Sequence, residues 1–233
     1  MTVSEIVKRV RSAIDELMQN DSEFLRKSND ELNLTDVIID KIGYALRHVL
    51  ENAPLDKLGN DAYKTLTPSQ MSNLFSKVNI GTTQDPVYKG RLILPSDLLR
   101  IIEARLSSWS LFPFPVPDTS QVYLMQQDQY ARGSWDRPVN VLTWDAADKR
   151  ILEMYCAKDN SDTLTFFYVA EPELTNVDAD HLSQDVSVPS QLEASLIYQI
   201  AGLAMTAFRE DIAGKLFAIS HRYLDPEQTD RGA

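Results

Sequence analysis

The period at which apolar residues recur changes twice along this chain, and this change constrains the fold more than any other feature. Near both ends apolar side chains recur every three or four residues, which is the spacing of one helix face. The middle instead contains short apolar runs separated by turn-forming residues, which is typical of strands. The pattern predicts an α+β protein that is predominantly helical: an antiparallel helix bundle with an inserted small antiparallel β meander.

Capping signals support the helices near the N-terminus. Thr2 and Glu5 have the spacing of a capping box directly ahead of the first apolar stripe. Thr35 is placed to cap a second helix, and Pro54 closes that helix. These two helices form the first predicted segment, residues 1–57.

Similar signals mark the C-terminal part. Ser190 and Glu193 form a second capping-box pattern, followed by an apolar stripe rich in Ala. A last helix is expected before the Asp225-Pro226 pair, so residues 188–224 are predicted to close the bundle. Residues 225–233 carry no large apolar side chain, and we expect a flexible tail there.

The middle of the chain divides into two predicted segments. Residues 58–135 are expected to mix strand and helix, with one helix over Ser96–Trp109 and a shorter one within Ser120–Tyr130. Between these helices, Leu111–Asp118 alternates prolines with apolar residues, which excludes a helix or a central strand. Residues 136–187 are predicted to hold the β meander and an acidic linker. The meander strands are expected at Val139–Trp144, Ile151–Tyr155 and Leu164–Val169.

Charge excludes some functions. The chain has 23 basic and 34 acidic residues, so its net charge is −11. This charge repels polyphosphate and argues against sequence-specific nucleic-acid binding. Eight acids and no Lys or Arg lie between Lys158 and Arg209. The longest apolar segment, Leu192–Phe208, is interrupted by polar residues, and the N-terminus is charged from Glu5 onward, so we expect neither a membrane span nor a secretory signal.

The sequence lacks the common catalytic patterns. It has no glycine-rich phosphate loop and no Gly-x-Ser-x-Gly elbow. His48, His181 and His221 do not have the spacing of a zinc hydrolase. Cys156, the single cysteine, lies in a β-like run and is expected to be a small buried residue rather than a reactive thiolate. We therefore expect no enzyme, no catalytic residue, no cofactor and no metal.

One local cluster leaves an alternative open. Asp178, Asp180 and His181 combine hard oxygen ligands with an imidazole, which is a combination that can hold a divalent cation. The same residues also fit a solvated acidic linker, because the glycine and terminal glutamate of a calcium loop are absent.

The aromatic residues of the middle also have two interpretations. Trp109, Phe112 and Phe114 surround the prolines, and they form either an exposed docking loop or the cover of one edge of the core. The other large aromatic residues here are expected in the core on strand faces: Trp135, Trp144 and Tyr155.

Several local sequences occur in a characteristic order after the N-terminal helix pair. They are Leu94–Arg100 before a helix expected to end at Trp109, Tyr123 with Gln126 and Gln127 ahead of Gly133, Arg137–Val139 at the start of a strand, and Val188–Ser190 before an Ala-rich helix. With this order of elements, the chain from about Ile6 to Tyr223 resembles the ring-forming head-to-tail connector (adaptor) proteins of tailed bacteriophages, in particular those of crAss-like phages. The inserted meander departs from the compact helical bundle usual among related connectors.

This resemblance implies a structural virion protein that is assembled in the bacterial host cytoplasm. Its subunits would form a ring, expected to be twelvefold, that connects the portal to the tail and lines the DNA channel. The implied partners are copies of the chain itself, the portal protein and further tail ring proteins, with the genome passing through the channel and no membrane involved. The alternatives are a small metal-dependent hydrolase with dispersed acidic ligands and a monomeric protein-binding module.

The resemblance also assigns expectations to particular segments. A closed ring needs a heterologous interface, to which the stripes of Leu34–Leu50 and Ser190–Phe208 are expected to contribute. Acids within Asp159–Glu193 are expected to face the channel, because exposed cations there would hold DNA. The tail, Asp225–Ala233, is expected to insert into the portal.

Overall fold

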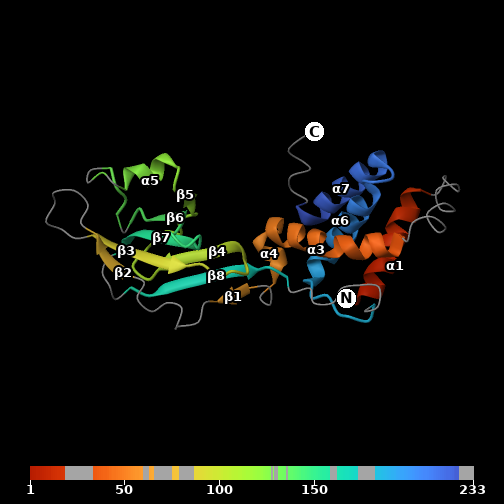
Figure 1. Cartoon of the computed structure of the whole chain (residues 1–233), viewed down its shortest axis with the longest axis horizontal. Coiled ribbons are helices and arrows are strands. Elements are labelled where there is room, and N and C mark those ends of the chain that lie inside the picture. Colours follow the sequence, from red (N-terminus) through yellow and green to blue (C-terminus); the bar gives the residue numbers. More distant parts are fainter. Residues whose placement is uncertain are drawn as a thin grey trace. The chain divides into compact units, whose positions relative to one another are not determined.

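The computed structural model describes residues 1–18, 34–59, 63–65, 75–78, 87–126, 128, 131–134, 136–157, 162–172 and 182–225. The chain folds as two compact units, each of which is best described by itself (Figure 1). The helical unit combines Met1–Ala62 with Glu171–Ala233, and the β unit consists of Tyr63–Ala170.

Helix α6 is the centre of the helical unit, because it packs against α1, α3 and α7. Most of its side chains are buried, including those of Leu196, Ile200 and Met205. The helices are α1 (Val3–Leu17), α3 (Leu34–Asn52), α4 (Leu55–Leu58), the 3₁₀ turn η3 (Ser190–Leu192), α6 (Glu193–Met205) and α7 (Glu210–Leu224).

The capping predictions have mixed outcomes. Thr2 caps α1 as predicted, since its side chain accepts a hydrogen bond from the backbone N–H of Glu5 at 3.2 Å. Thr35 lies inside α3, and its Oγ1 accepts a hydrogen bond from Arg11 Nη2 at 2.6 Å, so it is not the cap. Ser190 begins the 3₁₀ turn and makes no capping hydrogen bond, because this turn continues directly into α6 at Glu193.

Small residues let α6 and α7 approach closely. A Cβ atom added at Gly202 would lie only 2.5 Å from the ring of Phe217. Nearby, the buried hydroxyl of Ser220 donates to the backbone oxygen of Ser195 at 2.8 Å. Both helices therefore depend on small side chains at their contact.

The β unit contains two sheets. One has the strand order β1-β8-β4 and the other has the order β2-β3-β7-β6-β5. All neighbouring strands are antiparallel except β5 and β6. The elements are β1 (Tyr63–Thr65), β2 (Phe75–Val78), β3 (Val87–Ile93), β4 (Leu98–Leu106), β5 (Val116–Pro117), α5 (Gln121–Met125), β6 (Val139–Trp144), β7 (Arg150–Ala157) and β8 (Leu164–Ala170).

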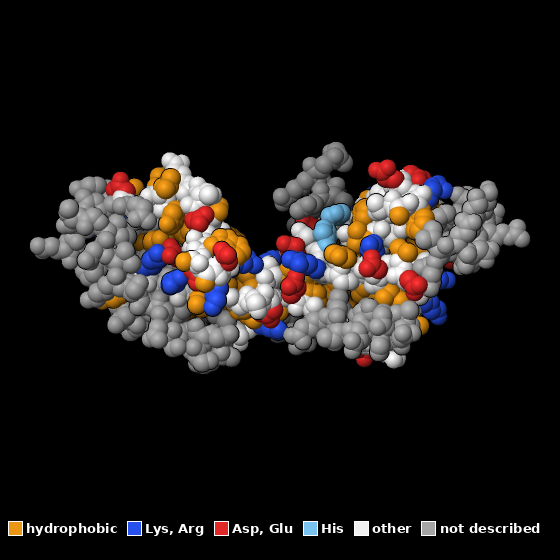
Figure 2. Space-filling model, in the orientation of Figure 1, with side chains coloured by type: hydrophobic (Ala, Val, Ile, Leu, Met, Phe, Trp, Pro, Cys, Tyr) orange, Lys and Arg blue, Asp and Glu red, His pale blue; other side chains and the backbone are white. Residues whose placement is uncertain are grey.

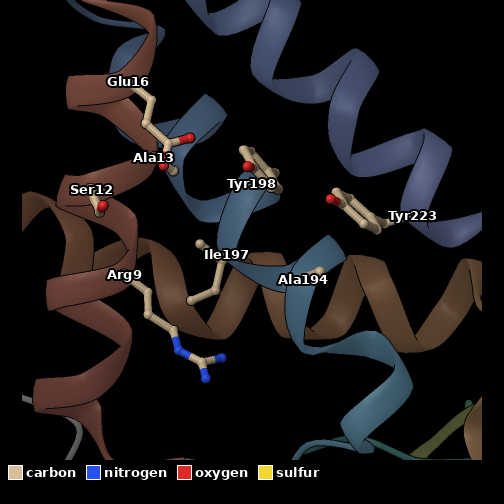
Figure 3. A pocket seen from close by; sticks show the side chains of 8 residues that line it. All are labelled: Arg9, Ser12, Ala13, Glu16, Ala194, Ile197, Tyr198 and Tyr223. Carbon is tan, nitrogen blue, oxygen red and sulfur yellow. The ribbon is translucent and has the colours of Figure 1, made fainter.

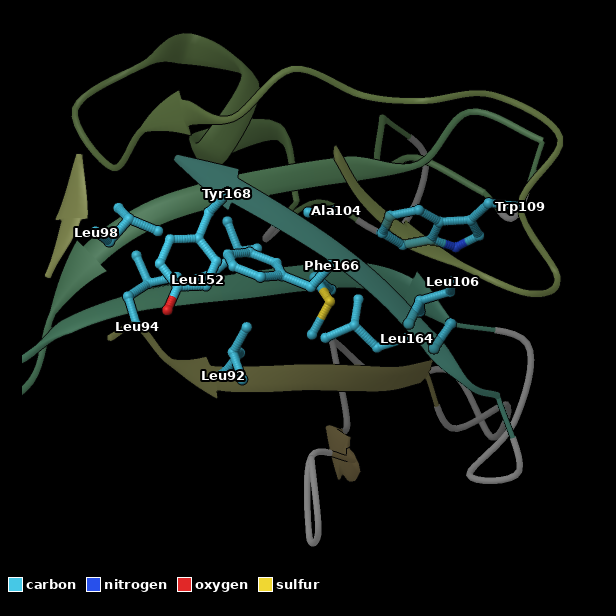
Figure 4. Close-up of a cluster of buried hydrophobic side chains, with 12 residues drawn as sticks. Leu92, Leu94, Leu98, Ala104, Leu106, Trp109, Leu152, Leu164, Phe166 and Tyr168 are labelled. Atoms are coloured by element: carbon cyan, nitrogen blue, oxygen red, sulfur yellow. The ribbon is translucent and has the colours of Figure 1, made fainter. Parts of the chain in front are cut away.

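One apolar core joins the two sheets of the β unit. Its members come from β3 and β7 of the larger sheet and from β4 and β8 of the smaller sheet (Figure 4). They include Leu92, Leu106, Leu152, Phe166 and Tyr168, together with Trp109 just after β4. This core makes the β unit a two-layered structure in its own right.

The prediction of a predominantly helical bundle with a small inserted meander is therefore wrong. The helix expected over Ser96–Trp109 is strand β4, which pairs with β8 along its length. The four-residue spacing of Leu98, Ile102 and Leu106 favoured a helix face in the sequence. In the structure two register shifts in β4 place Ile101 against the core together with Leu98 and Leu106. The non-local pairing with β8 decides between helix and strand.

The expected meander is also only partly correct. β6 and β7 form the predicted antiparallel hairpin. β8, however, pairs with β1 and β4 in the other sheet, because β7 already has β3 and β6 as neighbours on its two edges. The apolar runs in the sequence correctly located these three strands, but they did not show which strands pair with one another.

Candidate functional site

Titratable residues do not assemble into a metal site in the parts of the chain that the structure describes. His48 on α3 and His221 on α7 approach each other, with ring centroids 6.3 Å apart and planes nearly perpendicular. No third ligand accompanies them among the described residues. Asp178, Asp180 and His181 lie outside the described residues.

Cys156 is buried, as predicted, and occupies an irregular position in β7. Tyr88 pairs with Ala157 and Lys89 with Tyr155, so Cys156 is the extra residue of a β-bulge, with a φ of 70°. Its carbonyl accepts a hydrogen bond from Trp109 Nε1 at 3.1 Å. Burial raises the pKa of the thiol to about 11, which keeps it protonated at neutral pH. This cysteine therefore serves the strand geometry and not nucleophilic chemistry.

A cluster of partly buried charged and aromatic groups lies on β3 and β7. Lys89 Nζ is 2.5 Å from Glu153 Oε1, and the hydroxyl of Tyr155 donates to Glu153 Oε2 at 2.8 Å. The same ammonium lies 5.0 Å from the centroid of the Tyr155 ring. Burial, followed by the hydrogen bond to Glu153, raises the pKa of Tyr155 well above its usual value. These contacts tie the two strands together.

A different kind of surface lies in the segment Leu111–Met125. Three of its apolar side chains are more than half exposed: Leu111 at 58%, Phe114 at 79% and Leu124 at 62%. Val122 and Met125 are exposed as well. Figure 2 shows hydrophobic side chains gathered at the surface in the region of α5. We call this stretch the exposed apolar segment.

Two buried polar side chains hold the backbone of this segment. Asn140 is fully buried on β6, and its Nδ2 donates to the carbonyls of Pro113 at 3.1 Å and Ala104 at 2.9 Å. Gln126 is also buried and donates to the carbonyl of Val122 at 2.8 Å. The backbone of the exposed apolar segment is therefore held near both ends, while Leu111, Phe114 and Leu124 face solvent.

The aromatic residues around the prolines divide between the core and the surface, and docking through this loop stays a prediction. Trp109 belongs to the core, whereas Phe114 is exposed and touches Phe112 edge-on, with ring centroids 5.3 Å apart. Tyr155 is buried as expected. The prediction for Trp144 is wrong: it is 63% exposed, because it is the last residue of β6, where the hairpin turns. The side chain of Trp135 lies outside the described residues.

The residues expected at the ring and the channel have other contacts. The stripes of α3 and α6 are buried within the helical unit, so their apolar side chains are already covered. Glu171 pairs with Arg47, and Glu193 pairs with Arg9. The expected channel residues Asp159, Glu173, Asp178 and Asp180 lie outside the described residues, as does the tail beyond Asp225.

Sequence reasoning missed the two anchors of the exposed apolar segment. Asn140 stands in the otherwise apolar β run Val139–Leu142, and a polar residue at such a position is a usable signal of a buried hydrogen-bonding role. Gln126 gave no comparable signal, because glutamine is common on helix surfaces. Its role depends on a hydrogen bond from the backbone N–H of Gly133 at 3.2 Å, which only the folded chain creates.

Comparison with known proteins gives no family. No model of a known protein family matches the chain, and a search of curated proteins found no significant match. Among the described residues, no helix is both long and apolar enough to cross a bilayer.

Proposed function

We propose that this chain is a non-catalytic assembly protein whose β unit docks onto another protein through the exposed apolar segment. The observation that carries this proposal is the combination of exposed Leu111, Phe114 and Leu124 with a backbone fixed by Asn140 and Gln126. Burial of these side chains would contribute about 25 cal/mol for each Å² of apolar surface removed from water. The fixed backbone reduces the conformational entropy that docking would otherwise lose.

The assembly we propose is the connector ring of a tailed phage, in which the chain joins the portal to the tail as a repeated virion subunit. This part rests on the sequence resemblance, from which the helix before Trp109 must now be removed because that stretch is β4. The helices at the two ends of the chain remain, whereas the strand-rich middle departs further from the compact helical bundle of related connectors. A twelvefold ring, the portal and further tail rings as partners all belong to this proposal.

The distribution of charge supports a ring role. The helical unit has 12 basic and 23 acidic residues, a net charge of 12 − 23 = −11, whereas the β unit has 11 of each and is neutral. A subunit with two chemically different parts suits a heterologous interface, in which unlike surfaces meet. An acidic surface would also keep passing DNA from adhering.

The docking proposal is tested by assembly of the full chain with its portal. The double variant Phe114→Ser, Leu124→Ser should lose assembly in sedimentation and in electron micrographs, because the apolar surface is removed without touching the anchors. Ile93→Thr is the matched control, since Ile93 is an exposed apolar residue of the same unit outside this segment. Unchanged assembly of the double variant would contradict docking through this segment.

The connector proposal has a separate test. Purified virions should contain the chain, and cryo-electron microscopy should show its density as a ring between the portal and the tail. Absence of the chain from purified particles would rule out the connector role and, with it, the portal as the partner of the exposed apolar segment.

A further inference from the structure

A groove of about 300 Å³ lies on the helical unit between α1, α6 and α7. Arg9, Ser12 and Glu16 line it from α1, and Tyr198 and Tyr223 line it from α6 and α7 (Figure 3). The groove contains none of the residues of the exposed apolar segment. It therefore offers a second site, whose chemistry is different.

The two tyrosines give the groove a flat aromatic wall. Their rings stack with centroids 5.6 Å apart and planes within 9° of parallel, and Tyr223 is 48% exposed. Stacked rings with an accessible face attract planar cations, and a guanidinium is the best match among side chains. The aromatic wall therefore favours a cationic, planar ligand group.

The charges around the groove favour a cation as well. Arg9 is already compensated, because it lies 3.2 Å from Glu5 Oε1 and 2.9 Å from Glu193 Oε2. Glu16 forms no ion pair with any residue that the structure describes. The three carboxylates and one guanidinium give this region a net charge of −2. An anionic ligand would meet a neutralised arginine, whereas a cation would meet Glu16.

The carboxylate of Glu16 is also directed at the aromatic wall. Figure 3 shows Glu16 extending from α1 toward Tyr198. Burial raises the pKa of Tyr198, and the negative charge of Glu16 raises it further. The ring and the carboxylate therefore line the same groove.

We propose that this groove binds an arginine side chain presented by a basic segment of a partner protein. The guanidinium stacks on the Tyr198–Tyr223 pair and forms an ion pair with Glu16. Arginine is preferred over lysine because its planar head group is weakly hydrated and stacks on aromatic faces. The net charge of −11 on the helical unit draws such a segment toward the groove and speeds its association.

Peptide titrations of the full chain test this site. The probes are three short fluorescent peptides of equal length that carry three Arg, three Lys or three Asp residues. Binding is measured at about 50 and 300 mM NaCl, between which the screening length falls about 2.4-fold. The Arg peptide should bind saturably, the Lys peptide several-fold more weakly, and the Asp peptide not at all. Equal binding of the Arg and Lys peptides would overturn the stacking model.

Two neutral substitutions on α1 separate the groove from general electrostatic attraction. Glu16→Gln should weaken binding of the Arg peptide about tenfold, which is the loss of one ion pair. Asp15→Asn removes the same charge from the neighbouring exposed position, which does not line the groove, and should change affinity less than twofold. Equal effects of the two substitutions would mean that the groove is not the site.

The aromatic wall has its own pair of variants. Tyr223→Leu removes one ring of the stack and should weaken Arg-peptide binding severalfold, whereas Tyr198→Phe keeps the ring and should bind nearly normally. Circular dichroism melting curves of all variants identify any that are misfolded. Unchanged affinity of a folded Tyr223→Leu protein would contradict the stacking contact.

Discussion

The helical unit and the β unit differ in net charge and in the apolar side chains that they expose. The helical unit buries the stripes of α3 and α6 and carries the entire net charge of −11. The β unit has equal numbers of acidic and basic residues and leaves several large apolar side chains exposed. The comparison shows that the net charge resides in one part of the chain, whereas the exposed apolar segment lies in the other.

The two units can be followed separately in solution. All three tryptophans, Trp109, Trp135 and Trp144, belong to the β unit, so tryptophan fluorescence reports on that unit alone. Circular dichroism at 222 nm reports mainly on the helices. Substitutions that act on one unit should therefore shift one signal more than the other.

The largest effect is expected from Asn140→Ala in the β unit. The change removes two buried hydrogen bonds and leaves the carbonyls of Ala104 and Pro113 without their donor, which costs about 3 kcal/mol of unfolding free energy. Urea unfolding followed by tryptophan fluorescence measures it. Asn52→Ala on α3, followed at 222 nm, is the control, because the Asn52 hydrogen bond to His48 is exposed and its loss should cost less than about 0.5 kcal/mol.

A second effect is expected in the helical unit at the contact of α6 and α7. Gly202→Ala should destabilise this unit by about 2 kcal/mol, because the added methyl group collides with Phe217. Gly214→Ala on α7 meets open space and should stabilise the unit by about 1 kcal/mol through helix propensity. Urea unfolding followed at 222 nm measures both. The same sign for both substitutions would show that the close approach does not limit stability.

The third prediction concerns alkaline pH and the β unit. The unfolded state releases the Tyr155 proton near pH 10, whereas folded Tyr155 keeps it because burial and then Glu153 raise its pKa. Above pH 10 the folded state binds more protons, so stability falls as pH rises, by at most about 1.4 kcal/mol per pH unit. Tyr155→Phe should therefore lose less stability than the wild type between pH 9 and pH 11, by about 1 kcal/mol. Urea unfolding at pH 9 and pH 11 measures both proteins. An equal loss of unfolding free energy in the wild type and in Tyr155→Phe would disprove this prediction.

The smallest effect is expected from salt. Raising NaCl from about 0.05 to 0.5 M screens repulsion among like charges and should stabilise the acidic helical unit by a few tenths of a kcal/mol. The neutral β unit should respond less. If salt changes the unfolding free energy more by tryptophan fluorescence than by circular dichroism at 222 nm, the proposed difference in charge effects between the units is wrong.

The sequence predicted the helical unit better than the β unit, for a physical reason. A helix stripe such as that of α6 is a local pattern, because each turn makes its hydrogen bonds within the same segment. The partners of β4 and β8 lie far away along the chain, and β4 also fitted a helical spacing. Local periodicity therefore located the β6–β7 hairpin but left the assignment of strands to sheets open.

The same limit applies to the candidate sites. The proline pattern of Leu111–Asp118 predicted an irregular segment and an exposed docking loop as one of two interpretations. Its anchoring by Asn140 depends on a contact across the β unit, which no local pattern encodes. The groove has the same origin, because Tyr198 and Tyr223 meet only when α6 and α7 pack.

The helical unit consists of two stretches of the chain that flank the β unit, and this arrangement sets the order in which the two units can fold during synthesis. The β unit is one continuous stretch, Tyr63–Ala170, and can fold as soon as it leaves the ribosome. α1 and α3 emerge earlier but must wait for α6, their main packing partner, which is translated after the whole β unit. A chain that has emerged only through the β unit would therefore display the exposed apolar segment together with the apolar stripes of α1 and α3, which still lack α6 as their packing partner. Nascent chains of this protein are thus expected to depend on chaperones late in translation.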